Sequence, residues 1–272
     1  MKKIAFVVAD TANEPYLKMF VASLRKFHSE EELPLKIIGQ KEIDQIRVDE
    51  KFYKMTPYIA KDLIDEYDLV LKFDCDQIVC GDLSHIWKDT EYDVGTVYNW
   101  NRVDPKTFGE VQVWDVTSTI YYNCGFVAMR SKEFIDHWWM LCQKPNIKNY
   151  RYREQDLLNI LCYYGNYKVR CFDESKMWHG LVSKGEWNKC VMRGEDIIVP
   201  KGQDGFPTED KIVRMIHWGG GASGVKMNYR TFFQEPVIER LNYLTSTDKT
   251  KEPGTMEIED FTDKMVKDLG GK

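Results

Sequence analysis

The sequence predicts an α/β protein with a mainly parallel central sheet and helices on both faces. Short apolar runs at 3–10, 35–40 and 69–73 are typical of strands, and helical spacing of apolar residues marks 15–27 and 52–66 between them. This β-α-β-α-β order favours a parallel sheet with crossover helices. The first run, KIAFVVAD, is apolar at nearly every position rather than at alternate ones, which indicates a strand covered on both faces.

Each element has its own local signal. The segment PYLKMFVASLRKF begins with Pro15, which fits an early helix position. The helix at 52–66 leads through a break at Tyr67 and Asp68 into the strand LVLKF. Further strands are expected at 92–98, 119–130, 167–172 and 210–218, and further helices at 131–144 and 153–165.

Composition fits one folded domain. The chain has 272 residues, 43% of them hydrophobic, which is enough for a sizeable core. We assign residues 1–244 to a single domain and residues 245–272, which turn polar and charged, to a loosely held tail. The formal net charge of -5 provides no broad basic field, so neither nucleic acid nor an anionic membrane is expected as a partner.

The N-terminus and the cysteines favour a cytoplasmic location. The first apolar run meets Asp10 after about seven residues, too soon for a secretory or membrane-spanning segment, and we expect no transmembrane segment. The seven cysteines are odd in number and lack C-x-x-C pairs, so reduced thiols are expected.

Two aspartates follow the third predicted strand in LVLKFDCDQIVCG. Asp74 and Asp76 alternate with Cys75, so extended geometry points both carboxylates to one side. Two such close carboxylates repel each other unless a cation lies between them or one is protonated. Magnesium or manganese would suit oxygen ligands. The other interpretation is a pair of loop acids facing water. Asp10 also ends a strand, and ligands of open α/β sheets bind at such ends.

A second segment, KIVRMIHWGGG, strengthens the metal interpretation. His217 would end a strand and could be a third ligand, and mixed imidazole and carboxylate ligation favours manganese over magnesium. The alternative is a packed or capping histidine. The glycines after it leave backbone amides open to phosphate, and Lys226 and Arg230 downstream could neutralise phosphate charge. The alternative for this stretch is a surface loop.

Four blocks of the sequence resemble a known family. These are KIAFVVADTANEPYLKMFVASLRKF, YDLVLKFDCDQIVCGDLSHIW, YYNCGFVAMRSKEF, and YREQDLLNIL with the later MIHWGGG. They are similar to the retaining nucleotide-sugar glycosyltransferases of the GT-A fold, in particular glycosyltransferase family 8, the glycogenin and lipopolysaccharide galactosyltransferase group. The resemblance covers about residues 2 to 235.

The resemblance implies a site. The end of the first strand would hold the base and ribose of the donor, Asp74 would touch both ribose and metal, and the N-x-G segment would lie beside the donor sugar. The metal ligands would be Asp74, Asp76 and His217. The donor-binding residues implied are Ala9, Asp10, Thr11, Asn13, Asp74, Asn123, Gly125, Gly220 and Lys226.

Two positions depart from the family pattern. Ser223 occupies the position of the lysine in the family's H-x-x-G-x-x-K-P-W segment, and Lys226 comes three residues late. The family's D-Q-D segment reads Glu154, Gln155, Asp156, which keeps the charge but lengthens one arm.

The reaction implied is metal-dependent transfer of a hexose, with Mn²⁺ or Mg²⁺, from a nucleoside diphosphate sugar to an acceptor hydroxyl with retention. UDP-glucose and UDP-galactose are the implied donors, and a glycan, a lipid-linked sugar or a protein would be the acceptor. Gln155 would lie near the anomeric carbon, with Glu154 and Asp156 as the available carboxylates. We favour entry of the acceptor on the face that the leaving group vacates. Both acids could instead be N-terminal helix charges.

Several tryptophans and neighbouring polar residues are candidates for sugar or acceptor binding, and Trp178 and His179, in a loop-like stretch, are favoured. The other candidates are Trp100, Asn101, Arg102, Trp114 and Trp187.

Two other function classes start from the same residues. A phosphatase of the haloacid dehalogenase type also has D-x-D after an apolar strand, but here Ile78 takes the place of its Thr or Val and no Asp-Asp pair follows. A nucleotide-sugar-binding module without turnover would keep the fold and lose the chemistry. Intact Asp74, Asp76 and His217 argue against the latter.

Overall fold

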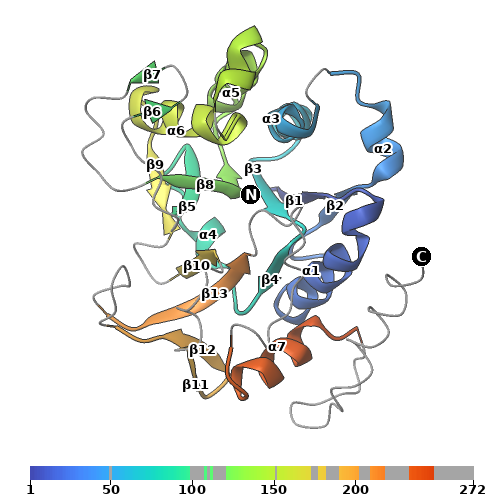
Figure 1. Ribbon diagram of the computed structural model, residues 1–272, viewed down its shortest axis with the longest axis vertical. Helices are drawn as coiled ribbons and strands as arrows, with labels where there is room; N and C mark the ends of the chain where they lie inside the picture. The colour runs from blue at the N-terminus through green and yellow to red at the C-terminus, as the bar shows by residue number, and fades with distance from the viewer. Residues whose placement is uncertain are drawn as a thin grey trace.

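The structure is a computed structural model in which two sheets pack between helices (Figure 1). It describes residues 1–48, 51–98, 107–108, 111–112, 121–150, 152–172, 177–181, 190–201, 209–217 and 233–247.

The larger sheet has six strands in the order β2-β1-β3-β8-β5-β9. β1 (Lys3–Val8) pairs in parallel with both β2 (Leu35–Ile38) and β3 (Leu69–Asp74). β8 (Tyr122–Met129) runs antiparallel between β3 and β5 (Val94–Tyr98), and β9 (Val169–Cys171) is parallel to β5. The expected mainly parallel sheet is confirmed.

Helices cover both faces of this sheet. On one face, Ile4 and Phe6 of β1 join a buried cluster with α3 (Lys51–Leu63), α5 (Lys132–Cys142) and α6 (Glu154–Tyr164). On the other, Ala5 and Val7 join a cluster with α1 (Glu14–Phe27) and the short α4 (His85–Lys88). Alternate residues of one apolar strand therefore face two different cores, which explains its continuous apolar character.

A second sheet, not predicted from the sequence, lies beside the first (Figure 1). Its order is β10-β13-β12-β11, with β4 also paired to β13. The strands are β4 (Gln77–Val79), β10 (Met177–Leu181), β11 (Val191–Arg193), β12 (Asp196–Val199) and β13 (Lys211–His217). β4, β12 and β13 share a third buried cluster with α7 (Val237–Thr245).

Several expected boundaries change. The strand expected at 35–40 ends at Ile38, because Gly39 caps α2 (Gln40–Gln45) and its N–H donates to Glu42 Oε2 at 3.1 Å. The helix expected at 52–66 ends at Leu63. Residues 177–181, expected in a loop, form β10. The remaining short elements are η1 (Thr11–Asn13), β6 (Thr107–Phe108), β7 (Val111–Gln112) and η2 (Pro145–Asn149).

In the part of the chain that the structure describes, no helix is long and apolar enough to cross a membrane. All seven cysteines lie in described segments, and all are free thiols. The α7 helix ends at Thr245, one residue beyond the expected domain boundary at 244.

Helix α6 is fixed to strand β8 by one asparagine. The side chain of Asn159 has no exposed surface, its Oδ1 accepts from the N–H of Tyr122 at 2.7 Å, and its Nδ2 donates to the carbonyl of Tyr122 at 2.8 Å. A second acceptor for Nδ2 is the carbonyl of Gln155 at 2.8 Å. The side chain amide thus pairs with β8 as a neighbouring strand would, and it sets the position of the start of α6.

We predict that Asn159→Ala destabilises the protein by about 2–4 kcal/mol, because two backbone groups of Tyr122 lose their buried partners. Urea unfolding followed by circular dichroism measures this. The control is Gln143→Ala at the exposed end of α5, expected within about 0.5 kcal/mol of the unchanged protein. A loss of less than about 1 kcal/mol in the free energy of unfolding for Asn159→Ala would contradict the conclusion that Asn159 fixes α6 to β8.

Candidate metal and donor site

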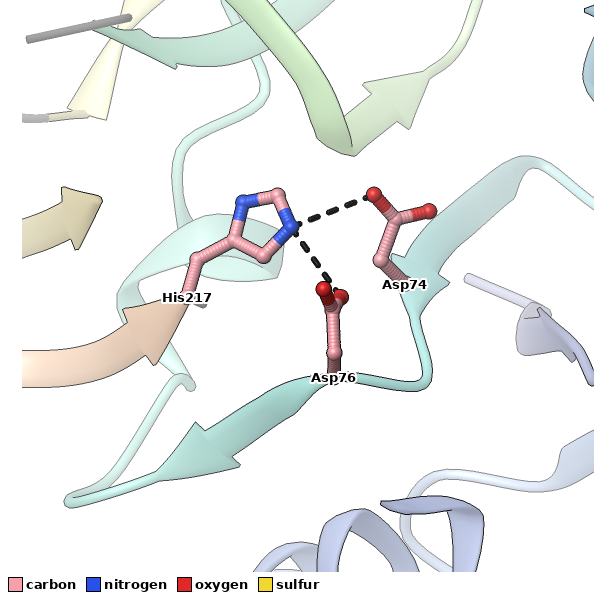
Figure 2. Close-up of side chains that lie close together, drawn as sticks. All are labelled: Asp74, Asp76 and His217. Atoms are coloured by element: carbon pink, nitrogen blue, oxygen red, sulfur yellow. Dashed lines mark ion pairs between the residues drawn. The ribbon is translucent and has the colours of Figure 1, made fainter. Parts of the chain in front are cut away.

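Two side chains from one turn and a third from a distant strand converge beside the larger sheet (Figure 2). Asp74 ends β3, Asp76 lies in the turn before β4, and His217 ends β13. The Nε2 atom of His217 lies 3.3 Å from Asp74 Oδ2 and 3.1 Å from Asp76 Oδ1. The arrangement confirms that the two aspartates and the histidine predicted as ligands meet in space.

Strand pairing explains this convergence. In the parallel pair β1 and β3, Val8 lies opposite Asp74, so the chain leaves both strands at the same sheet edge. In the antiparallel pair β4 and β13, Gln77 lies opposite His217, which brings the imidazole next to Asp76. The turn between β3 and β4 therefore joins the two sheets at the point where the carboxylates lie.

A glycine makes room for the histidine. A Cβ atom at Gly125 would lie 2.2 Å from Cε1 of His217 and 2.6 Å from Oδ1 of Asn123. The same Asn123 oxygen accepts from the N–H of Gly125 at 2.7 Å. The N-x-G segment of β8 thus forms the wall against which the imidazole ring packs, and no side chain fits there.

The cluster attracts positive charge. Burial lowers the pKa of His217, but the carboxylates of Asp76 and Asp74 raise it more, to about 9. Burial raises the pKa of Asp74, but Lys72 and His217 hold it well below its usual range. The two carboxylates therefore stabilise the protonated form of the His217 imidazole. A divalent cation between them would compensate their negative charge in the same way.

The residues present fit a divalent metal. One ligand atom from each of Asp74, Asp76 and His217 can be chosen so that all lie within 4.8 Å of one another. Two carboxylates and one imidazole suit manganese, and they are also compatible with magnesium.

The segment after β1 turns sharply at the same sheet edge. The Oδ1 atom of Asp10 accepts from the N–H of Asn13 at 3.0 Å and from its Nδ2 at 2.8 Å, which caps η1. The N–H of Thr11 donates to Gln40 Oε1 at 3.3 Å. Ala9 is buried, and its N–H donates to the carbonyl of Ile38 at 3.0 Å. These four donor-binding candidates, Ala9, Asp10, Thr11 and Asn13, form one hydrogen-bonded corner.

The start of α6 lies against the same strand as the glycine. Gln155 Oε1 accepts from the N–H of Cys124 at 3.0 Å, and Glu154 Oε1 accepts from the Cys124 thiol at 3.7 Å. Glu154 Oε2 is shielded from solvent and has no hydrogen-bond partner among the described residues. Burial raises the pKa of Glu154 to about 8, against opposing effects of a backbone hydrogen bond and of Lys72.

Asp156 is held by structural contacts. It is 1% exposed, Tyr121 donates its hydroxyl hydrogen to Oδ1, and the N–H of Tyr152 donates to Oδ2 at 2.9 Å. Burial raises the pKa of Tyr121 well above its usual range, and Asp156 adds to this effect. The arrangement favours a positioning role for Asp156 over direct chemistry.

The remaining candidate site residues lie outside the described part of the chain or are described there only as backbone. Gly220 and Lys226 are outside the described residues, as are Trp100, Asn101, Arg102, Trp114 and Trp187, while Trp178 and His179 are described only as backbone of β10. Sequence reasoning missed Lys72 and Cys124, which join the Asp74, Asp76 and His217 cluster to α6. Their only signal was position, two residues before Asp74 and between Asn123 and Gly125.

Comparison with known proteins identifies the class of fold. The chain has a GT-A fold, with a mainly parallel central sheet flanked by helices, as the resemblance implied. It is similar to the galactosyltransferase LgtC in complex with donor and acceptor sugar analogues, with a TM-score of 0.54 and 15% identity over 92% of this chain and 97% of that chain.

A second similar structure is the WbbM bifunctional glycosyltransferase in its apo form. The TM-score is 0.52 and the identity 11% over 80% of this chain, and the match covers 46% of WbbM, so the chain spans about half the length of that protein. No family model and no curated protein matches the sequence. At these identities the likeness is one of fold.

We predict that Gly125→Ala weakens Mn²⁺ binding at least about tenfold, because the added methyl group displaces the His217 imidazole. Titration of free Mn²⁺ by electron paramagnetic resonance measures the affinity without any donor. The matched control is Gly39→Ala, where the Cβ would meet Glu42 Oε2 at 3.4 Å, an ordinary contact, and binding should be unchanged. Equal affinity of Gly125→Ala and the unchanged protein would show that His217 is not a ligand.

Proposed function

We propose that this chain is a metal-dependent glycosyltransferase that moves a hexose from a nucleoside diphosphate sugar to an acceptor hydroxyl with retention. The single observation that carries the proposal is the Asp74, Asp76 and His217 cluster at the strand ends of a GT-A fold. A sugar nucleotide leaves as a diphosphate with growing negative charge, and a divalent cation at this position would be the main means of stabilising it.

In this proposal Asp74 Oδ2, Asp76 Oδ1 and His217 Nε2 would hold Mn²⁺, with Mg²⁺ as the alternative, since two carboxylates and an imidazole suit manganese. When bound, the metal would supply Lewis-acid stabilisation of the diphosphate oxygens. The protein residues contribute fixed positions: the Asp10 corner would hold the nucleoside, and Asn123 and Gly125 would border the donor sugar.

The environment of α6 supports entry of the acceptor on the face that the leaving group vacates. Both oxygens of Asp156 are engaged by Tyr121 and Tyr152, and Glu154 with a pKa of about 8 is mostly protonated near neutral pH, so neither carboxylate is a good nucleophile. Gln155 is held by Cys124, and its amide dipole would stabilise the developing positive charge at the anomeric carbon.

In this route the bond from the anomeric carbon to the phosphate oxygen breaks, and its electron pair leaves with the diphosphate. The acceptor oxygen forms the new bond on the same face. Its proton passes to the departing phosphate oxygen, so no protein base is required.

The proposal extends to partners and place. UDP-glucose or UDP-galactose would be the donor, and a glycan, a lipid-linked sugar or a protein would supply the hydroxyl. The cytoplasmic location expected from the free thiols belongs to the same proposal. Gly220 and Lys226 would complete the phosphate contacts.

The main alternative is a sugar-nucleotide-binding module without turnover, since the fold alone serves both. The GT-A fold disfavours the phosphatase alternative. The presence of His217 beside Asp74 and Asp76 also disfavours it, because such a phosphatase has no use for a histidine in this place.

Asp76→Asn is predicted to lower the release of UDP from UDP-glucose and UDP-galactose at least about 100-fold, because one metal ligand and its charge are lost. Donor hydrolysis is measured with Mn²⁺ and with a chelator, and the unchanged protein should release UDP only with the metal. Asp65→Asn, which removes an exposed partner of Lys132, serves as the control and should keep full activity.

Full activity of Asp76→Asn would contradict the metal assignment. If the unchanged protein binds the donors but releases no UDP from a wide donor panel, the binding-module alternative holds instead.

A further inference from the structure

A buried lysine lies directly behind the proposed metal cluster. Lys72 stands two residues before Asp74 on β3, and its side chain is 6% exposed. Its ammonium donates to Asp74 Oδ1 and, at 2.7 Å, to the carbonyl oxygen of Cys124. Val70, on the same face of β3, belongs to a buried hydrophobic cluster, so the lysine extends from an apolar layer toward Asp74.

A lysine in this place has a cost that an apolar residue would avoid. Taking an ammonium group out of water is unfavourable unless charged partners and hydrogen bonds replace the water. A leucine or methionine would fill the same strand position without that cost. A hydrogen bond that only joins β3 to β8 is therefore a weak explanation for a buried charge at Lys72.

The two oxygens of Asp74 have different partners. Oδ1 accepts from Lys72, while Oδ2 faces His217 Nε2 at 3.3 Å, on the side of the cluster. The lysine thus occupies the oxygen that is turned away from the metal position. It leaves Asp74 to offer the metal one oxygen in one orientation.

Cys124 links Lys72, and through it Asp74, to the start of helix α6. Its carbonyl accepts from Lys72, its N–H donates to Gln155 Oε1 at 3.0 Å, and its thiol lies 3.7 Å from Glu154 Oε1. One residue of β8 therefore connects the ligand Asp74 to the start of α6, where the donor sugar would lie.

We propose that Lys72 is a positioning residue that fixes Asp74 as a one-oxygen metal ligand and sets the metal relative to Gln155 through Cys124. The inference rests on the proposed function, because it assigns Lys72 a part in that same site. It does not make Lys72 a ligand or a group that touches the donor.

The test is Mn²⁺ alone, titrated by electron paramagnetic resonance into the full chain without nucleotide. Lys72→Met should weaken Mn²⁺ binding about tenfold or more, as loss of groups that orient metal ligands does. Lys72→Arg keeps the donors and the charge, and should restore binding to within about threefold of the unchanged protein. Lys211→Met removes another buried strand lysine, on β13, and should leave Mn²⁺ binding unchanged.

The sign of the change separates two roles. If Lys72 acted only through its charge, its removal would tighten the binding of a cation. Unchanged or tighter Mn²⁺ binding by folded Lys72→Met would overturn the proposal. Lys72 would then only join β3 to β8 through its hydrogen bond to Cys124. Thermal unfolding reports whether each variant is folded. If Lys72→Met does not fold, Lys72→Leu, which also has no hydrogen-bond donor, carries the same expectation.

Failure of the proposed function gives a different pattern. If the unchanged protein binds no Mn²⁺, the metal site and this inference fall together. If it binds Mn²⁺ through Asp76 and Lys72→Met binds equally well, only the inference falls.

Discussion

The repulsion between the carboxylates of Asp74 and Asp76 is the constraint on which the site depends. The turn between β3 and β4 brings them together, and the fold places cationic or protonatable groups around them: His217 on one side and Lys72 on the other. Each group comes from a strand whose pairing fixes its place. A divalent cation bound by these side chains would therefore link the larger sheet to the smaller one.

The packing around this cluster leaves little freedom. Gly125 is a glycine because His217 occupies the space where its Cβ would be. Asn159 fixes α6 on β8, and Cys124 joins the same strand to Lys72 and Gln155. A site built on paired strands and a clamped helix start suits a reaction in which the protein mainly holds charges and dipoles in place.

Much of this could be predicted from the sequence, because the signals were long or lay at strand ends. The strands of the larger sheet show as apolar runs, and the helices α1, α3, α5 and α6 show as helical spacing of apolar residues. Asp74 and His217 end strands, and Asp76 follows Asp74 by two residues. The elements β4, β11, β12, α2 and α4 have only three to six residues each, too few to show a period. Lys72 could not be singled out, since a strand lysine usually reaches water and only the pairing with β8 shows otherwise. The sequence left Asp156 open between an available carboxylate at the site and an N-terminal helix charge, and only its contacts with Tyr121 and Tyr152 show how it is held.

Anomalous diffraction at the manganese absorption edge, from crystals grown with Mn²⁺ and UDP, tests the central claim most directly. We predict one strong peak within coordination distance of Asp74 Oδ2, Asp76 Oδ1 and His217 Nε2, with the diphosphate of UDP completing the ligands. A peak elsewhere, or UDP bound with no metal between the aspartates and the histidine, would contradict this account.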